Sequence, residues 1–394
     1  MKRIILAAAL VTVAACSSGS DGAATTTEAP TTTAAPTTTA ASTTTTEAPA
    51  TTDGVLETTT TVLEEVAFRQ PLTGEPAVAE ADVVSRPAIA VKIDNNNANA
   101  RPNHSGLANA DIVFEEIVEF GTRFAAIFHT QGADPLGPIR SGREQDVDLL
   151  SSFNQPLFAW SGGNPGVTRL IRDSTLTDLN ASVSASRAYY RGPGSAPHDL
   201  YSSTDALYEF TPDGHPGAPV QQFAYVSPGN AFVGTPVASF ELGLDNYTIG
   251  WEWDDAQSSF ARFQQGSRHV DVVNGDIFAT NVVVMAIDYI ASSIDSAAPD
   301  GQTVGSGPVW VFSDGAVVTG RWERNDAFDP LRFVDADGDD IALNPGNTWI
   351  ELADNSGGGE YTTRTLDGLD RSTIPQIELG DPASFPADIT IVAS

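Results

Sequence analysis

The chain has 394 residues and a formal net charge of −31, with 51 Asp and Glu residues against 20 Lys and Arg residues. This balance argues against nucleic-acid binding and against a protein that lies flat on anionic lipid, because both need a basic surface. The length allows two or three domains, and the presence of one cysteine excludes a disulfide bond within the chain.

The first sixteen residues have the pattern of a bacterial lipoprotein signal. Lys2 and Arg3 precede an apolar run at residues 4–13, which is too short to span a membrane permanently. Cys16 follows Val-Ala-Ala, which resembles the bacterial lipobox, and lipid attachment would account for a lone cysteine in a secreted chain. We therefore expect residues 1–15 to be a signal peptide and Cys16 to anchor the chain on the extracytoplasmic side of the cell membrane. The alternative is an ordinary signal peptide and a free thiol at Cys16.

Low-complexity sequence flanks the part of the chain that we expect to fold. Residues 16–67 are rich in Thr, Pro and Ala and have no periodic apolar face, so we expect a disordered stalk. Residues 355–394 form an acidic tail rich in Gly and Ser, which we expect to be loosely ordered. The stalk would hold the folded domains away from the membrane.

Residues 68–215 alternate between strand and helix patterns. Near-continuous apolar runs separated by helical segments predict an α/β domain with a mostly parallel or mixed sheet that is covered on both faces. The predicted strands are residues 88–94, 111–118, 123–128, 156–160 and 187–190, and the predicted helices are residues 144–153, 167–172 and 203–210.

Residues 216–354 follow a Pro- and Gly-rich hinge and change to a period of two. Short alternating runs with turn residues about every ten positions predict a mainly antiparallel β domain. The predicted strands are residues 240–242, 248–253, 260–263, 282–287, 309–312, 317–322 and 349–352. Arginine is concentrated in the first domain: residues 86–199 hold ten Lys and Arg against twelve acids, and residues 200–394 hold seven against 29.

Several short motifs resemble one bacterial family in the order in which they occur. They include RPAIAVKIDN at residues 86–95, GPIRSGR at 137–143, PHDLY at 197–201 and GNTWI at 346–350. These stretches resemble the YerB-like lipoproteins, a family of unknown function with an N-terminal and a separate C-terminal domain. The resemblance implies an envelope lipoprotein and brings no established reaction. The chain departs from the family pattern at His104 and by one residue near Glu119.

Four polar features follow the predicted strands of the α/β domain. They are Asp94 with Arg101 just beyond it, residues 137–143, residues 161–164, and the pair at residues 198–199. Ligands of open α/β sheets bind outside the carboxyl ends of the strands. If these strands are parallel, the four features converge on one edge and form a binding site.

The sharpest local motif places two arginines at the start of a helix. Arg140 and Arg143 flank Ser141, and a helix N-terminus with bidentate arginines suits phosphate or carboxylate. The alternative is structural, because Ser141 and Glu144 have the spacing of a capping box. The arginines would then pair with nearby acids at positions 115, 116 and 119.

An acid–base pair is the second chemical possibility. Glu115 or Glu119 with His198 could act in hydrolysis. The alternative is a buried network in which Glu and Arg satisfy each other. Ser141 or Ser161 with His198 and an Asp would make a catalytic triad, but neither serine stands in the Gly-x-Ser-x-Gly context of a nucleophile elbow. The five histidines lack metal-ligand spacing, so we predict no metal and no cofactor.

These patterns predict a lipid-anchored accessory or binding module of the cell envelope. It would engage an anionic wall component or a wall-synthesis protein through its first folded domain. The predicted binding residues are Asp94, Arg101, Arg123, Arg140, Ser141, Arg143 and Asp199. One alternative is an envelope hydrolase that uses Glu115, Glu119 and His198. Another is that the acidic β domain contacts a partner protein.

Overall fold

The computed structural model describes residues 68–355 and 389–392, which all belong to one compact unit. The predicted signal peptide, Cys16, the predicted stalk and residues 356–388 of the predicted tail lie outside the described residues. Among the residues that are described, no helix is both long enough and apolar enough to cross a membrane.

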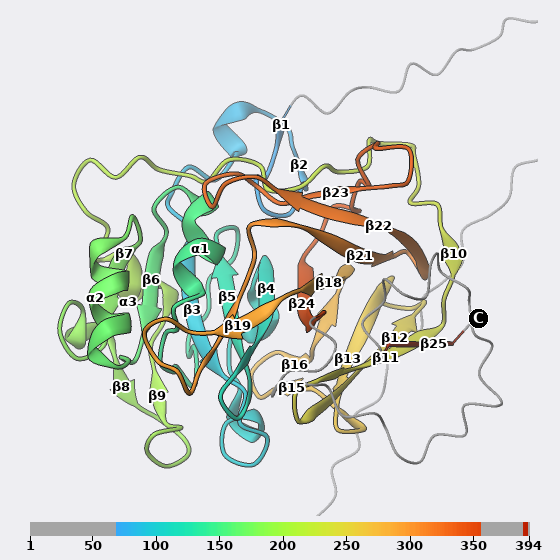
Figure 1. Ribbon diagram of the computed structural model, residues 1–394. Coiled ribbons are helices and arrows are strands. Elements are labelled where there is room, and N and C mark those ends of the chain that lie inside the picture. Colours follow the sequence, from blue (N-terminus) through green and yellow to red (C-terminus); the bar gives the residue numbers. More distant parts are fainter. Residues whose placement is uncertain (1–67, 356–388, 393–394) are drawn as a thin grey trace, which may run out of the picture. The chain divides into compact units, whose positions relative to one another are not determined.

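A mixed sheet of eleven strands forms the centre of the fold (Figure 1). Its strands in spatial order are β10 (Thr235–Pro236), β22 (Ala316–Arg324), β21 (Gly305–Ser313), β18 (Asn281–Ile287), β24 (Thr348–Asp354), β4 (Ile112–Val118), β5 (Gly121–Phe128), β3 (Ile89–Asp94), β6 (Leu157–Trp160) and β7 (Thr177–Asn180), and β23 (Arg332–Val334) pairs with β22. Strand β6 is parallel to both of its neighbours, β3 and β7. Strand β5 is antiparallel to both of its neighbours, β4 and β3. The mixed sheet expected for the first domain is therefore confirmed.

The two predicted domains share this sheet. Strand β24 pairs in parallel with β4 on one side, where Thr348 faces Ile112, and with β18 on the other, where Thr348 faces Asn281. The strands of residues 281–334 are antiparallel to one another, as the period of two predicts. The sheet therefore continues across the predicted boundary at residue 216, and both parts contribute to one hydrophobic core.

A second, antiparallel sheet packs on the C-terminal half of the first. It contains β11 (Ser239–Leu244), β12 (Tyr247–Asp254), β13 (Ser259–Gln264), β14 (Ser267–Arg268), β17 (Phe278–Ala279) and β25 (Ile389–Val392). The rings of Phe240 and Phe312 stack across the two sheets with their centroids 3.7 Å apart. Strand β25 pairs with β11, so this part of the predicted tail is ordered backbone, contrary to our expectation of a loose segment.

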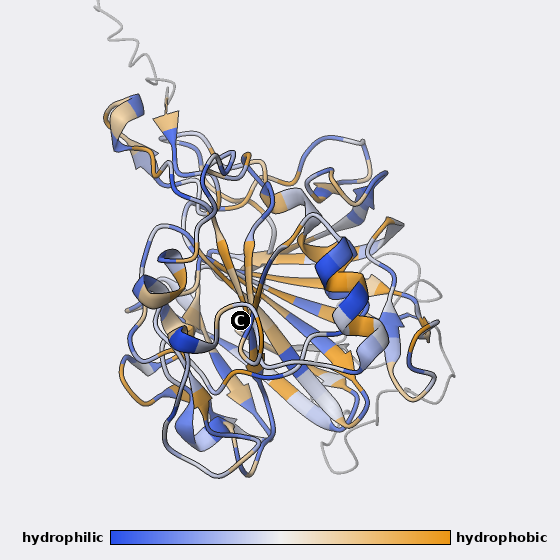
Figure 2. Ribbon diagram, turned by 90° about the vertical axis from the view of Figure 1, so that its left-hand side faces the viewer, coloured by the Kyte–Doolittle hydropathy of each residue, from blue (hydrophilic) through white to orange (hydrophobic). Residues whose placement is uncertain are grey.

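Three short helices flank the N-terminal half of the large sheet, and Figure 2 shows helices on both sides of its apolar strands. They are α1 (Asp146–Leu150), which continues as a 3₁₀ turn at Ser151–Phe153, α2 (Pro165–Asp173) and α3 (Thr204–Tyr208). All three were predicted. Asn164 caps α2 by accepting a hydrogen bond from the Val167 amide, and Pro165 takes the first helical position, which needs no amide donor.

The predicted strand at residues 187–190 is wrong for all but its last residue, because only Tyr190 lies in a strand, β8 (Tyr190–Arg191). Residues Ser186–Ala188 form a 3₁₀ turn, because the Ala188 amide donates to the Ala185 carbonyl.

Short two-stranded ribbons complete the fold: β1 (Phe68–Arg69) with β2 (Pro76–Ala77), β8 (Tyr190–Arg191) with β9 (Leu200–Tyr201), β15 (Val270–Asp271) with β16 (Gly275–Asp276), and β19 (Tyr289–Ala291) with β20 (Pro299–Gly301).

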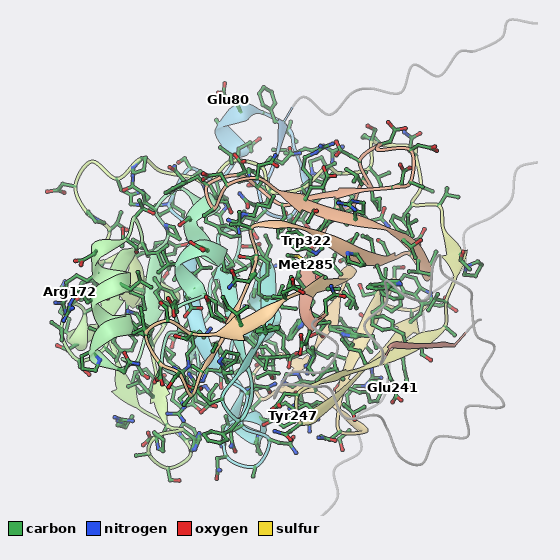
Figure 3. All side chains as sticks on the ribbon, viewed as in Figure 1. Glu80, Arg172, Glu241, Tyr247, Met285 and Trp322 are labelled. Carbon is green, nitrogen blue, oxygen red and sulfur yellow. The ribbon has the colours of Figure 1, made fainter. Side chains whose placement is uncertain are left out.

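Burial separates the core from the surface in the expected way. Figure 3 shows Met285 and Trp322 within the large sheet and Arg172 and Glu241 toward the outside. Every residue of β3, β4 and β5 is buried, including the charged side chains of Lys92, Glu115 and Glu116. Buried charges need partners, so these strands carry polar networks inside an apolar sheet.

Candidate functional site

A cleft of about 620 Å³ lies at the carboxyl ends of the parallel strands β3, β6 and β7. The turn after β6 contributes residues 161–164, and the turn after β7 contributes Ala181 and Ser182. Its charged lining residues are Glu119, Arg140, Arg143, Arg191 and Asp295. Three of these are arginines, in a part of the molecule where the sheet topology favours ligand binding.

Arg140 reaches the cleft although the preceding strand ends at the opposite edge. Strand β5 is antiparallel to β3, but the chain returns beside β3, where Ile139 bridges to Ile93 and the Arg140 amide donates to the Lys92 carbonyl at 2.8 Å. The Ser161 amide then donates to the Arg140 carbonyl at 2.9 Å. The predicted convergence of Asp94, residues 137–143 and residues 161–164 therefore occurs, with a returning segment in place of one parallel strand.

Asp94 pairs with two groups at this edge. Its carboxylate lies 3.0 Å from Nε of Arg140 and 2.5 Å from Nδ1 of His198. The side chain of Arg140 is 22% exposed, whereas that of Asp94 is 5% exposed. The buried Asp94 carboxylate therefore contacts both Arg140 and His198, and of these three residues only Arg140 lines the cleft.

Arg123 and Arg143 complete a cluster of three arginines with Arg140. Arg143 donates to the Glu119 carboxylate from Nε at 3.1 Å and from a terminal nitrogen at 2.6 Å. Arg123 donates to the Ser141 carbonyl at 2.9 Å. Burial, together with the charges of Arg143 and Arg140, lowers the pKa of Arg123 to about 9. The pKa of Glu119 is lowered: burial would raise it, but the hydrogen bond from Arg143 and its charge outweigh burial.

Four of the seven predicted binding residues, Asp94, Arg101, Arg123 and Asp199, do not line the cleft. Arg101 donates to the carbonyls of Ser267 and Arg268 at 2.7 and 2.8 Å, so it ties the two parts of the chain together. Arg101 follows the turn after β3, in which the Asp94 carboxylate accepts a hydrogen bond from the Asn96 amide. Asp199 accepts from Arg191 at 2.5 Å and orients that arginine, which does line the cleft.

The predicted acid–base pair of Glu115 and His198 is not assembled. Glu115 is fully buried and accepts hydrogen bonds from Asn95 at 3.0 Å and Thr122 at 2.6 Å, and it pairs with Arg262. Because β4 is buried on both faces, a glutamate on either face enters the core. Among the described contacts, His198 meets the Asp94 carboxylate and no serine hydroxyl, so the serine triad is not formed either.

A directional hydrogen-bond chain links Asp94 to the C-terminal part, and no local sequence pattern predicts its partners. Arg262 can only donate, so Nδ1 of His269, at 2.6 Å, accepts. The neutral His269 ring then donates from Nε2 to Nδ1 of His104 at 2.7 Å. His104 in turn donates from Nε2 to the Asp94 carbonyl at 2.6 Å. Burial lowers the pKa of His104 to about 4 and that of His269 well below its ordinary value, so both rings are neutral near pH 7.

A second buried network lies beneath the cleft. Lys92 pairs with both Glu116 and Asp146, and the other oxygen of Asp146 accepts from the Arg143 amide at 2.6 Å. Burial and the nearby Asp146 charge raise the pKa of Glu116 to about 7, although Lys92 opposes this shift. The network fixes the turn that carries Arg143.

Among residues 68–355 and 389–392, no group of three or more His, Cys, Asp or Glu side chains could hold a metal ion.

Comparison with known proteins identifies relatives of the fold and of the sequence. The N-terminal domain of a protein of unknown function (DUF3048) matches residues 72–216, and the C-terminal domain of the same family matches residues 240–350. A Bacillus subtilis protein named "Putative lipoprotein YerB" is 28% identical over 300 residues, which cover 72% of this chain and 86% of that protein. The crystal structure of YerB protein from Bacillus subtilis matches with a TM-score of 0.62 at 24% identity, and it covers 73% of this chain and 96% of that chain. At this identity, the structural match shows the fold.

Proposed function

This chain belongs to the DUF3048 family, and we propose that it is a lipid-anchored binding module of the cell envelope that takes an anionic ligand in the cleft at the ends of β3, β6 and β7. Two observations support the anchor: the sequence pattern around Cys16, and a relative whose name describes a lipoprotein. We further propose that the folded part faces the extracytoplasmic side, in reach of wall components and wall-synthesis proteins.

The arginine cluster at one side of the cleft is the observation that carries the ligand class. Arg140 and Arg143 line the cleft and pair with Asp94 and Glu119, and the buried Arg123 behind them adds a third positive charge that has no ion pair among the described contacts. An excess of guanidinium groups at a partly exposed edge favours a phosphate or carboxylate, which arginine binds through parallel hydrogen bonds.

The start of α2 adds to this preference. Gly163 and Asn164 line the cleft directly before Pro165, the first residue of the helix. The positive end of the helix dipole is therefore at the cleft and favours an anion there. The arginines and the helix end come from separate turns of the same sheet edge, so they act on one bound group together.

The hydrolase alternative is less well supported by the geometry. Glu115 has no exposed surface and cannot meet a substrate, and Glu119 is held by Arg143. The pairing of Asp94 with His198 suits a role in holding Arg140, because the same carboxylate contacts both groups.

A thermal-shift screen of the protein against tripolyphosphate, muropeptides and short acidic peptides tests the proposed function. A ligand that binds the folded state raises the melting temperature as its concentration rises. We expect at least one of these anions to stabilise the protein and expect Arg140→Gln to remove most of that shift. Arg332→Gln is the matched control, because Arg332 is 55% exposed and lies outside the cleft. No shift with any anion, or an equal shift in Arg140→Gln, would contradict the proposal.

A further inference from the structure

A hairpin from the C-terminal part of the chain reaches the cleft. Strands β19 and β20 are joined by residues 292–298, and Asp295 of this connection lines the cleft. Figure 1 shows the hairpin beside the N-terminal part of the fold. Asp295 is therefore the one cleft-lining residue, among those described, that comes from beyond residue 216.

The hairpin connection is fixed in position by three sets of contacts. Ser292 and Ser293 both donate hydroxyl hydrogen bonds to the Glu144 carboxylate, the second at 2.6 Å. The Gly301 amide donates to Oε1 of Gln145 at 2.7 Å. Ile294 packs on Gly166, where an added Cβ would lie 2.2 Å from the isoleucine side chain. The close approach to α2 therefore needs a glycine, and it places Asp295 at the start of that helix.

Asp295 brings a negative charge that no cation neutralises among the described contacts. Its Oδ2 accepts from the side-chain amide of Asn164 at 2.9 Å, and its Oδ1 accepts from the Ala297 amide at 3.3 Å. Both donors are neutral. The other acid in the lining, Glu119, is paired with Arg143 at 2.6 Å. A carboxylate has about four acceptor positions, so Asp295 keeps free positions for a ligand.

The cleft therefore has an arginine side with excess positive charge and one point of negative charge. The lining also includes the small polar and backbone groups of Ser161, Gly162, Gly163 and Ser182. Such neutral groups suit peptide bonds, and about 620 Å³ is within the range of small-ligand sites, roughly 300–1,000 Å³. A ligand made only of phosphates would meet repulsion from Asp295.

We propose that the ligand is zwitterionic, an amino acid or short peptide whose carboxylate binds Arg140 and Arg143 and whose ammonium group binds Asp295. This inference rests on the proposed function, because it adds a cation-binding residue to the same anion site. It also gives the C-terminal part of the chain a role in ligand recognition.

Isothermal titration with glycyl-glutamate and N-acetyl-glycyl-glutamate tests this inference. Acetylation removes the ammonium group and keeps both carboxylates, so a simple anion site binds the acetylated peptide at least as well. We expect the unmodified peptide to bind about tenfold or more tightly, the usual effect of one hydrogen bond between charged groups. Asp295→Asn, which still accepts from Asn164, is expected to abolish this preference. Asp288→Asn removes an exposed carboxylate outside the cleft and should keep it.

The outcomes separate this inference from the proposed function. If the acetylated peptide binds as tightly as the free peptide, or if Asp295→Asn keeps the preference, the zwitterionic assignment is wrong and an anion site remains. If neither peptide binds and tripolyphosphate does not bind either, the proposed function fails and this inference fails with it.

Discussion

Arg140 at the cleft and Arg262 between the two sheets both pair with a carboxylate, but solvent reaches only the first. The side chain of Arg140 is 22% exposed, and its partner Asp94 is shared with His198. Arg262 and its partner Glu115 are both 0% exposed. Arginine therefore occurs both in a partly exposed ion pair, Arg140 with Asp94, and in a fully buried one, Arg262 with Glu115, which we call the sealed pair.

The surroundings of the two arginines explain the difference in role. The guanidinium of Arg262 lies 4.8 Å from the Trp349 ring centre and 5.4 Å from that of Phe124, so aromatic rings occupy the space a ligand would need. Arg140 faces a cleft. Buried ion pairs give little net stability but are costly to break, whereas exposed pairs can exchange partners with little change in stability. We therefore assign Arg262 to folding and Arg140 to binding.

Breaking the sealed pair should have the largest effect. Arg262→Met leaves Glu115 buried without its cation and is expected to lower the free energy of unfolding by about 3–5 kcal/mol in urea titrations. Adding Glu115→Gln should recover part of this loss, because Gln is neutral and still bonds to Asn95 and Thr122. A loss below about 1 kcal/mol in the single variant would show that this network is not needed for folding.

The second network should make stability depend on pH. The pKa of Glu116 is raised from 4.5 to about 7, so between these values the folded state keeps a proton that the unfolded state releases. The free energy of unfolding contributed by Glu116 therefore falls as the pH rises from about 4.5 to about 7, by at most about 1.4 kcal/mol per pH unit.

Glu116→Gln isolates this contribution. The depressed pKa values of His104 and His129 act in the opposite direction, because each histidine adds stability as the pH rises from about 4 to 6.5. The difference between the unfolding curves of Glu116→Gln and the parent protein removes the histidine contribution. We expect this difference to grow in favour of the variant as the pH rises through the same range, and a flat difference would rule out the raised pKa.

A change at the cleft should affect binding much more than stability. Arg140→Gln is expected to weaken the strongest-binding anion of the screen by about tenfold or more. It should change the free energy of unfolding by about 1 kcal/mol or less, because the arginine is partly exposed and Asp94 keeps His198 as a partner. Calorimetric titration and urea unfolding of the same preparation check both parts.

The smallest effect is expected on the acidic surface. Arg332 is 55% exposed and pairs with Asp340 at 2.7 Å and Glu323 at 3.7 Å. Arg332→Gln should change the free energy of unfolding by about 0.5 kcal/mol or less and leave anion binding unchanged. A loss of binding in this variant would place the ligand on the C-terminal part.

Local patterns predicted most of the elements, because their signals lie within short stretches. The apolar runs at β3 and β5 and the caps of α2 and α3 each sit within a few residues. The joining of the two halves could not be predicted in this way. Strand β24 pairs with β4 across more than 230 residues, and the residue pattern of neither strand indicates which strand it pairs with.

The candidate site shows the same division. The sequence placed Asp94 and residues 161–164 correctly, because both follow parallel strands directly, but Arg140 and Arg143 reach the same edge through a segment that returns beside β3, which the strand pattern did not predict. The burial of Glu115 could not be predicted from the sequence, because it depends on the second sheet that covers β4 and on the ion pair with Arg262 of β13. The contribution of Asp295 depends on a hairpin that begins more than 100 residues after the cleft turns.

The most direct test of this account measures Arg140→Gln and Arg262→Met together, each by anion titration and by urea unfolding. The account predicts a crossed result: Arg140→Gln loses about tenfold or more in affinity and keeps its stability, whereas Arg262→Met loses about 3–5 kcal/mol of stability and, while folded, keeps its affinity. If Arg140→Gln instead destabilises the protein as much as Arg262→Met and binds the anion unchanged, the cleft arginines are structural and the proposed site is wrong.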